Sequence, residues 1–503
     1  MTRTRRRSHV ADAADVAAVR EGLARLDAAA AADATGDKQA RAADIFAPQH
    51  HVHALDPSTT LVLGPRGTGK SFWAGVLAQD DTRELAAEFY PRLGLNDLLV
   101  SVSFSGLDDA PVTRDLVDEQ VPEGSEAVEG RRLWRSAILR EVLRATGQDA
   151  PRVGRLMRDS SDVEDWQDAM EVGNAHLRAH GKRVLVLFDA LDSLSTDWNR
   201  LRDLIDALLR VAWGLRGYSA VRAKLFLRPD QLNELKPPFV ELPKLKADAA
   251  NLDWEAVDLY GMLFSRLAID SDARDGFASI LRELGIPRPP AADRREDFGS
   301  WPLSHDGDQQ RRLFERLAGQ FMGAGRRKGR TYDWPINHLG DGFGDVTPRS
   351  FLMLMRRAGQ EALSNLGSDG DGAFTAITPE GLRRGLQQAS RVRIEQLEAE
   401  YPWIPRALAP LGGLLVPNKP DEFYRRWKEE ATLQAIDKAA RERRFLPPLS
   451  DEDKASRTTR EAALAERMIG MGVLTRRDDK RLDMPDLFRV GAALLKKGSV
   501  PPS

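Results

Sequence analysis

The 503-residue sequence contains no cysteine. Disulfide bonds, zinc sites built on thiolates and cysteine nucleophiles are therefore excluded together. The lack of disulfides fits a reducing compartment, and we expect a cytoplasmic protein. No apolar run approaches the roughly 18 residues that a membrane-spanning helix needs. The run from Arg3 to Arg7 is followed by Ala- and Asp-rich sequence without the apolar segment of a secretory signal, so we expect no membrane attachment.

Neither sign of charge dominates. The chain has 74 Lys and Arg against 76 Asp and Glu, a formal net charge of −2. No overall basic field draws it to nucleic acid, so any nucleic-acid surface must be local. With 42% hydrophobic and 30% charged residues, the composition is that of a globular protein. No internal repeat with a period of about 20–50 residues is present, so a solenoid is not expected.

A glycine-rich motif follows the first strong strand pattern. The apolar, β-branched run at residues 59–63 leads into Gly-Pro-Arg-Gly-Thr-Gly-Lys-Ser at 64–71, and a helical pattern follows at 72–77. Strand, glycine-rich turn and helix form the context that a P-loop requires. We therefore predict a nucleotide-binding loop at residues 64–71.

Alternating strand and helix patterns surround this motif. Strands are predicted at residues 59–63, 98–102, 184–188 and 223–227, and helices at 131–146, 161–180 and 198–214. Strands that alternate with helices indicate βαβ units and a parallel sheet covered by helices on both faces. The predicted fold class is α/β, a P-loop NTPase sheet, followed by a helical lid and a C-terminal winged helix.

The glycine-rich motif matches G-x-x-x-x-G-K-[ST] in full. We expect its backbone amides and the helix N-terminus to bind phosphates. Lys70 should reach the β- and γ-phosphates, and the Ser71 hydroxyl should be a ligand of Mg²⁺. The predicted cofactors are ATP and Mg²⁺, and the predicted binding residues are Gly64, Pro65, Arg66, Gly67, Thr68, Gly69, Lys70 and Ser71.

A second carboxylate-bearing motif follows the strand predicted at residues 184–188. Asp189 is expected at the carboxyl end of that strand, next to the strand that precedes the phosphate loop, where it would orient Mg²⁺. Asp192, one turn later, can accept a proton from the attacking water as a general base. The alternative is an ordinary strand end capped by an aspartate.

The two aspartates also carry a family resemblance. Asp189-Ala190-Leu191-Asp192 resembles the D-x-x-D Walker B motif of the STAND and KAP classes, rather than the adjacent Asp-Glu pair of typical AAA+ motors. Residues 225–229 are similar to the STAND pattern in which the next strand ends in an arginine, which implies that Arg228 contacts the terminal phosphate. The alternative is a surface arginine. Ser193 stands where a catalytic glutamate often follows in relatives such as the NACHT group, which implies slow turnover.

Residues 347–352 open an amphipathic helix. It resembles the sensor-2 helix of AAA+ lids in the origin-recognition and replication-initiator branch. The resemblance implies that Arg349 reaches the nucleotide from the lid. The alternative is a capped helix with an incidental arginine.

The C-terminal pattern predicts a winged helix. A helix at 460–470 precedes an apolar-then-basic segment at 473–477, a polar turn at 478–480 and a second short segment at 481–484. The predicted domains are a tail and helix at 1–45, a P-loop core at 46–245, a lid at 246–366, and a helical region with the winged helix at 373–503. The Gly/Asp-rich run at 367–372 is interpreted as a linker.

The winged-helix region is locally basic. Residues 456–503 contain ten Lys and Arg against six Asp and Glu, a balance of +4. Basic residues of the predicted wing are placed for phosphate contacts, whereas two aspartates at its tip would repel phosphate. The basic residues are Arg476, Arg477, Lys480 and Arg481, and the aspartates are Asp478 and Asp479. Winged helices of such ATPases also serve as protein contacts or as structural clamps, so duplex DNA is one of several alternatives for this surface.

These patterns leave three hypotheses. The first is a Mg²⁺-dependent ATPase that acts as a regulatory switch, forms a homo-oligomer and controls a separate effector protein, for example in bacterial defence. The second is an initiator- or loader-like ATPase that binds duplex DNA through the winged helix. The third is a binding module without ATPase chemistry, which the serine at position 193 leaves open.

Overall fold

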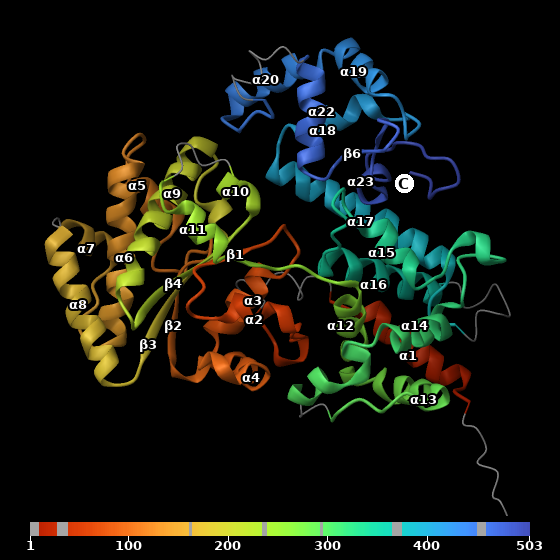
Figure 1. The fold of residues 1–503 in the computed structure, drawn as a ribbon, viewed down its shortest axis with the longest axis horizontal. Coiled ribbons are helices and arrows are strands. Elements are labelled where there is room, and N and C mark those ends of the chain that lie inside the picture. Colours follow the sequence, from red (N-terminus) through yellow and green to blue (C-terminus); the bar gives the residue numbers. More distant parts are fainter. Residues whose placement is uncertain are drawn as a thin grey trace, which may run out of the picture. The chain divides into compact units, whose positions relative to one another are not determined.

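The computed structural model describes residues 10–27, 39–159, 163–233, 239–291, 295–364, 375–449 and 459–502. The basic run at 3–7 and the predicted linker at 367–372 lie outside these ranges. The chain divides into two compact units. The α/β unit comprises Ala29–Asp253, and the helical unit combines Met1–Ala28 with Trp254–Ser503 (Figure 1).

The α/β unit contains a five-stranded parallel sheet, which confirms the predicted α/β class. Its strands are β1 (Leu61–Leu63), β2 (Leu98–Phe104), β3 (Arg183–Phe188), β4 (Val221–Leu227) and β5 (Ala250–Asn251). Their order across the sheet is β2-β3-β4-β1-β5, and each neighbouring pair is parallel. This arrangement is compatible with a P-loop type of α/β fold.

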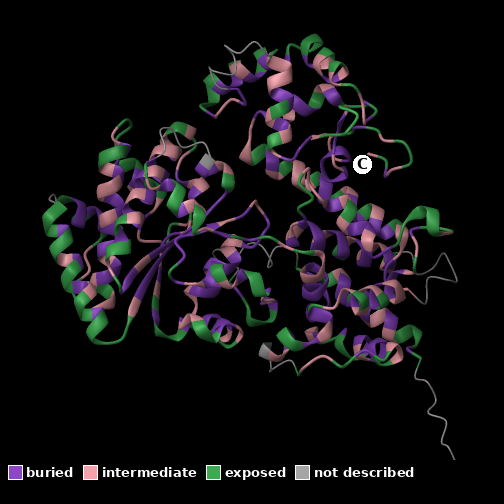
Figure 2. Ribbon diagram, in the orientation of Figure 1, coloured by how far each residue is buried: buried purple, intermediate pink, exposed green. Residues whose placement is uncertain are grey.

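The apolar runs form strands because both faces of the sheet are covered. On β3, Val184 and Val186 belong to one hydrophobic cluster, whereas Leu185 and Leu187 belong to the other. The sequence of a strand that is buried on both faces is a continuous apolar run, without alternation of apolar and polar residues. Figure 2 shows the buried strands between the two helical layers.

Helices cover the two faces of the sheet. One cluster packs α3 (Lys70–Ala78) and α4 (Asp80–Phe89) against the sheet. The other packs helices that include α6 (Arg131–Ala145) and α9 (Trp198–Gly214). The remaining helices of the unit are α2 (Val52–Leu55), α5 (Arg114–Gln120), α7 (Val153–Asp159), α8 (Val163–Ala179), α10 (Pro229–Asn233) and α11 (Leu242–Ala247).

The helical unit begins with the N-terminal helix α1 (Ala13–Arg25). A β-carbon added at Gly359 would lie 2.8 Å from the backbone nitrogen of Ala24, so the two helices that carry these residues approach closely. The other helices are α12 (Ala256–Ile269), α13 (Arg274–Leu284), α14 (Gly307–Ala318), α15 (Asp333–Leu339), α16 (Pro348–Ser364), α17 (Pro379–Glu400), α18 (Ile404–Leu408), α19 (Pro420–Glu429), α20 (Thr432–Arg443), α22 (Arg460–Gly470) and α23 (Asp486–Arg489). Helix α1 therefore belongs to this unit rather than standing apart with the tail.

A helix followed by a hairpin lies where the C-terminal pattern predicted them. Helix α22 is followed by β6 (Thr475–Arg476) and β7 (Leu482–Asp483), which pair antiparallel. That these elements form a winged helix stays a prediction. Across the described ranges, no helix combines the length and the apolar character needed to cross a membrane.

Candidate nucleotide-binding site

The predicted phosphate loop runs from the end of β1 to the start of α3. Gly67 and Gly69 have φ angles of 86° and 102°, in the left-handed region where glycine has no steric penalty. The Thr68 hydroxyl donates a hydrogen bond to Pro65 O at 2.9 Å, and a β-carbon at Gly64 would lie 2.4 Å from that hydroxyl. The glycines are therefore needed for this tight loop, as the motif predicts.

Lys70 is the first residue of α3. Its Nζ donates to Gly64 O at 2.7 Å and to Pro65 O at 3.0 Å, so the ammonium group lies against the loop. Its charge opposes the rise in the pKa of Asp189 and contributes to the lowered pKa of Asp192, although other groups contribute more in each case. The structure thus brings the predicted lysine and both predicted aspartates into one electrostatic environment.

Asp189 lies directly after β3 and is only 3% exposed. Its burial raises its pKa, and a hydrogen bond from the Ser71 side chain is the largest of the effects that oppose this rise. Ser71 and Asp189 also line the same cavity, so the two predicted metal ligands lie near each other. They supply hard oxygen donors, and Mg²⁺ typically takes one or two protein ligands and completes its shell with water and phosphate. The residues present fit this ion.

One part of the prediction was wrong. Asp189 is not on the strand next to the one that precedes the loop, because β4 separates β1 from β3. The residues meet because parallel strands end at a common edge, where the loop passes the end of β4 and Gly64 N donates to Leu227 O at 3.2 Å. Apolar patterns identify strands but do not give their order in the sheet.

The turn between the two aspartates has an unusual backbone. Ala190 has a φ angle of 51°, a left-handed conformation that few residues other than glycine adopt. The Ser193 hydroxyl donates to Ala190 O at 2.8 Å and so closes the turn. A β-carbon at Gly106 would lie 2.6 Å from this hydroxyl. At position 193, the side chain therefore stabilises the turn that places Asp192.

Asp192 accepts hydrogen bonds from two arginines. Its Oδ2 lies 2.5 Å from Arg66 Nη2 and 3.2 Å from Arg228 Nη1. Burial opposes ionisation of Asp192, but the charge of Arg228, followed by that of Arg66, outweighs burial and lowers the pKa. Among the described residues, Oδ1 has no hydrogen-bond partner. This oxygen is the one that can accept a bond from water.

Arg228 follows β4 and is 5% exposed, so the alternative of a solvated surface arginine does not hold. Its guanidinium also contacts Asp230 at 3.0 Å. Sequence reasoning assigned Arg66 to the loop but missed its pairing with Asp192. No local pattern signals that pairing, because it depends on the order of the strands.

A cavity of about 210 Å³ adjoins the predicted metal ligands. Ser71 and Asp189 line it together with Ser105 and Asp109, which lie in the loop after β2. The sequence prediction missed these two residues. Ligands of open α/β sheets bind beyond the carboxyl ends of the parallel strands, and this rule could have identified the loop after β2 from the sequence.

Arg349 lies in the first turn of α16, where Thr347 Oγ1 accepts a bond from Ser350 N at 3.3 Å. The helix is therefore capped near its predicted start. Arg349 belongs to the helical unit, whereas the phosphate loop belongs to the α/β unit. Its contact with nucleotide stays a prediction.

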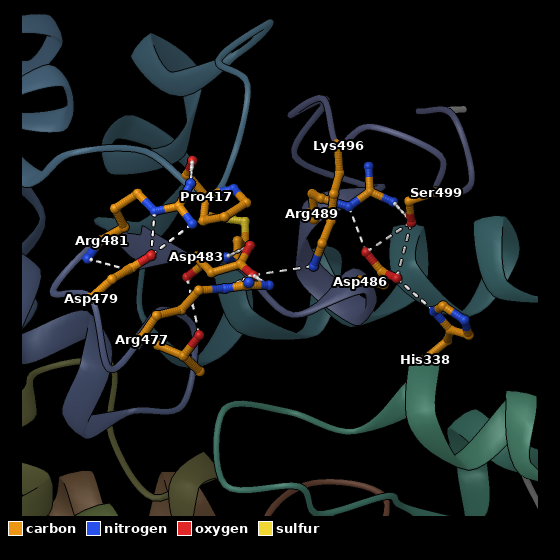
Figure 3. A network of polar contacts seen from close by, with 12 residues as sticks. His338, Pro417, Arg477, Asp479, Arg481, Asp483, Asp486, Arg489, Lys496 and Ser499 are labelled. Atoms are coloured by element: carbon orange, nitrogen blue, oxygen red, sulfur yellow. Dashed lines mark hydrogen bonds and ion pairs between the residues drawn. The ribbon is translucent and has the colours of Figure 1, made fainter.

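The basic residues of the hairpin contact acidic neighbours. Arg477 and Lys496 contact Asp483 at 2.6 and 3.2 Å, and Arg481 contacts Asp479 at 2.7 Å (Figure 3). Arg476 forms an ion pair with Glu466. Within the described ranges, Lys480 forms no ion pair. A phosphate would have to compete with these carboxylates for the three arginines.

Three comparisons, with protein-family models, with curated proteins and with solved structures, find no significant match to this chain.

Proposed function

We propose that this protein binds and slowly hydrolyses Mg²⁺-ATP as a cytoplasmic regulatory switch of the AAA+/STAND kind, controlling its own assembly or a partner effector, as in bacterial defence. The observation that carries the proposal is that Ser71 and Asp189 line one cavity next to the loop against which Lys70 lies. A hydroxyl, a buried carboxylate and an ammonium group at the end of a phosphate loop match the groups that P-loop ATPases use.

Each residue has a distinct role in the proposed reaction. Lys70 and the loop amides bind the phosphates, and Ser71 and Asp189 hold the metal, which neutralises charge that develops on the phosphate oxygens. Asp192 Oδ1 orients the attacking water. Because two arginines lower the pKa of Asp192, its carboxylate is a weak base, which supports slow turnover.

The two arginines support a switch. Arg66 and Arg228 both contact Oδ2 of Asp192, so the two guanidinium groups share one acidic partner. The terminal phosphate of ATP offers both of them a further acceptor, and ADP does not. The arginines would therefore distinguish the two nucleotides, and Arg349 would extend this response to the helical unit.

Calorimetry with Lys70→Ala tests the proposal. The parent chain should bind ATP with Mg²⁺, and the variant should bind it at least tenfold more weakly because it lacks the ammonium contact to the phosphates. Lys182→Ala, at an exposed position between α8 and β3, is the matched control. Equal affinities of the parent and Lys70→Ala would contradict the proposal.

A DNA-binding ATPase with a winged helix is the second candidate. The local charge of +4 in residues 456–503 favours it, whereas the ion pairs of the hairpin arginines count against it. Binding of duplex DNA that weakens with salt and with the double substitution of Arg476 and Arg477 to Ala would support it. No binding at low salt eliminates it. The third candidate, an inert module, predicts ATP binding without phosphate release.

A further inference from the structure

A second, larger cavity lies in the α/β unit. Its volume is about 540 Å³, and none of the residues assigned to the nucleotide site lines it. Four arginines line it, with one acidic residue, Glu241. The arginines are Arg131, Arg132, Arg135 and Arg210. So strong an excess of one charge in a concave site indicates a site for an anion.

The four arginines lie on two helices. Arg131 and Arg135 are four residues apart on α6, so they share one face of that helix, and Arg210 comes from α9. Arg132 and Arg210 have acidic partners, Glu129 at 2.9 Å and Asp206 at 2.7 Å. Within the described ranges, the side chains of Arg131 and Arg135 form no ion pair and no hydrogen bond.

Arg131 and Arg135 repel each other, and the Arg135 guanidinium lies over the ring of Trp166, 5.5 Å from the ring centroid. Burial lowers the pKa of Arg135, and the charge of Arg131 lowers it further. Like charges four residues apart on a helix are destabilising, and the contact with Trp166 offsets this only for Arg135. A bound anion would remove the repulsion. The two charges match those of a phosphate monoester, which carries about −1.5 to −2 at pH 7.

The rim of the cavity is apolar. Val128 and Val163 line it and are 56% and 44% exposed, and Val240, between two lining residues, is 88% exposed. The aromatic rings of the cavity are already covered, since Arg210 lies over Phe239 at 5.0 Å and Arg216 over Trp213 at 4.7 Å. Lys244 also lies over the Trp213 ring, at 5.8 Å, and Phe239 is only 5% exposed, which disfavours stacking of the bases of single-stranded nucleic acid on these rings.

We propose that this cavity binds a small organic phosphate, with the phosphate on Arg131 and Arg135 and the apolar part of the molecule against the valine rim. Guanidinium groups bind phosphate oxygens through paired hydrogen bonds. The volume lies within the range of about 300–1,000 Å³ that small-molecule sites occupy. The site is separate from the proposed ATPase chemistry.

The experiment uses the full chain with Lys70→Ala, so that the phosphate loop contributes as little as possible. Phenyl phosphate serves as the probe in calorimetry at constant ionic strength, and inorganic phosphate and a thymidine oligonucleotide serve as comparisons. We expect saturable binding of phenyl phosphate, weaker binding of inorganic phosphate, and a loss of at least tenfold when Arg131→Gln and Arg135→Gln are combined. Val163→Glu should also weaken binding, because it places a negative charge at the exposed rim, where it would repel the phosphate.

The matched control combines Arg155→Gln with Arg178→Gln, which makes the same change in net charge at exposed positions on α7 and α8. This control should leave the affinity for phenyl phosphate unchanged. An equal loss in the control, unaltered affinity in the cavity variants, no saturation at millimolar phenyl phosphate, or binding of the oligonucleotide alone would each overturn the proposal.

Discussion

Individual polar residues at the end of the sheet carry the proposed chemistry. Asp189 and Asp192 lie three positions apart, yet their environments shift their pKa values in opposite directions. Burial raises the pKa of Asp189, whereas two arginine charges outweigh burial at Asp192 and lower it. Different environments can give two carboxylates different roles. We therefore assign metal binding to Asp189. We assign to Asp192 the orientation of the attacking water and of the two arginines.

Replacing Asp189 with asparagine should separate binding from hydrolysis. The neutral amide cannot offset the charge of the metal, so we expect phosphate release at saturating Mg²⁺-ATP to fall at least tenfold. ATP binding through the loop should weaken less. Asp203→Asn, on the partly exposed side of α9, is the control. An unchanged rate of phosphate release in Asp189→Asn would rule out the assigned role.

Because Lys224 is buried, we expect the free energy of unfolding to depend on pH. It is fully buried on β4, where Nζ donates to Asp56 O and Thr59 O, and burial lowers its pKa from 10.5 to about 7. Between these values the unfolded chain binds more protons than the folded one, so this group makes stability rise with pH from about 7 to 10.5 and fall as pH is lowered.

Urea unfolding at pH 7 and pH 9 measures this effect. The parent should gain up to about 1.4 kcal/mol per pH unit relative to Lys224→Met, which lacks the titrating group. Lys182→Met, at an exposed position, should keep the parent's dependence. If Lys224→Met and the parent respond equally to pH, the lysine does not titrate in this range.

At the scale of elements, glycines determine how α1 packs. A β-carbon at Gly22 would lie 2.5 Å from the β-carbon of Ala273, and one at Gly276 would lie 2.5 Å from Asp15 O. A β-carbon at Gly359 on α16 would lie 2.8 Å from the β-carbon of Leu23. Helix α1 therefore fits against α13 and α16 only because side chains are missing at these positions.

Gly359→Ala tests this packing. In a solvent-exposed helix a Gly→Ala change would raise the free energy of unfolding by roughly 1 kcal/mol. Here we expect this free energy to fall by about 1–3 kcal/mol, because the new methyl group overlaps α1. Gly470→Ala, at the end of α22 with open space around it, is the control and should not lose stability. A more stable Gly359→Ala variant in thermal unfolding would show that α1 can shift at little cost.

At the scale of the whole molecule, the proposed switch concerns assembly. Light scattering should show that ATP with Mg²⁺ changes the particle size of the parent, whereas ADP does not. The reason is that Arg66 and Arg228 gain a phosphate acceptor only with ATP. Lys70→Ala should not respond to either nucleotide. The same size in ATP and ADP for the parent would remove assembly from the proposal and leave control of a partner.

The sequence alone determined the glycine-rich loop between a strand and a helix, the α/β class, four of the five strands and the positions of the main helices. These features follow from local patterns: a contiguous motif, apolar runs and helical periodicity. It also gave the bounds of α22 and the place of the hairpin after it.

Only the tertiary structure decided the strand order, the placement of β4 between β1 and β3, and the pairing of Asp192 with Arg66 and Arg228. It also assigned α1 to the helical unit and gathered the arginines of α6 and α9 around one cavity. The physical reason is that such contacts join residues far apart in the chain, and local patterns do not record which distant elements pack together.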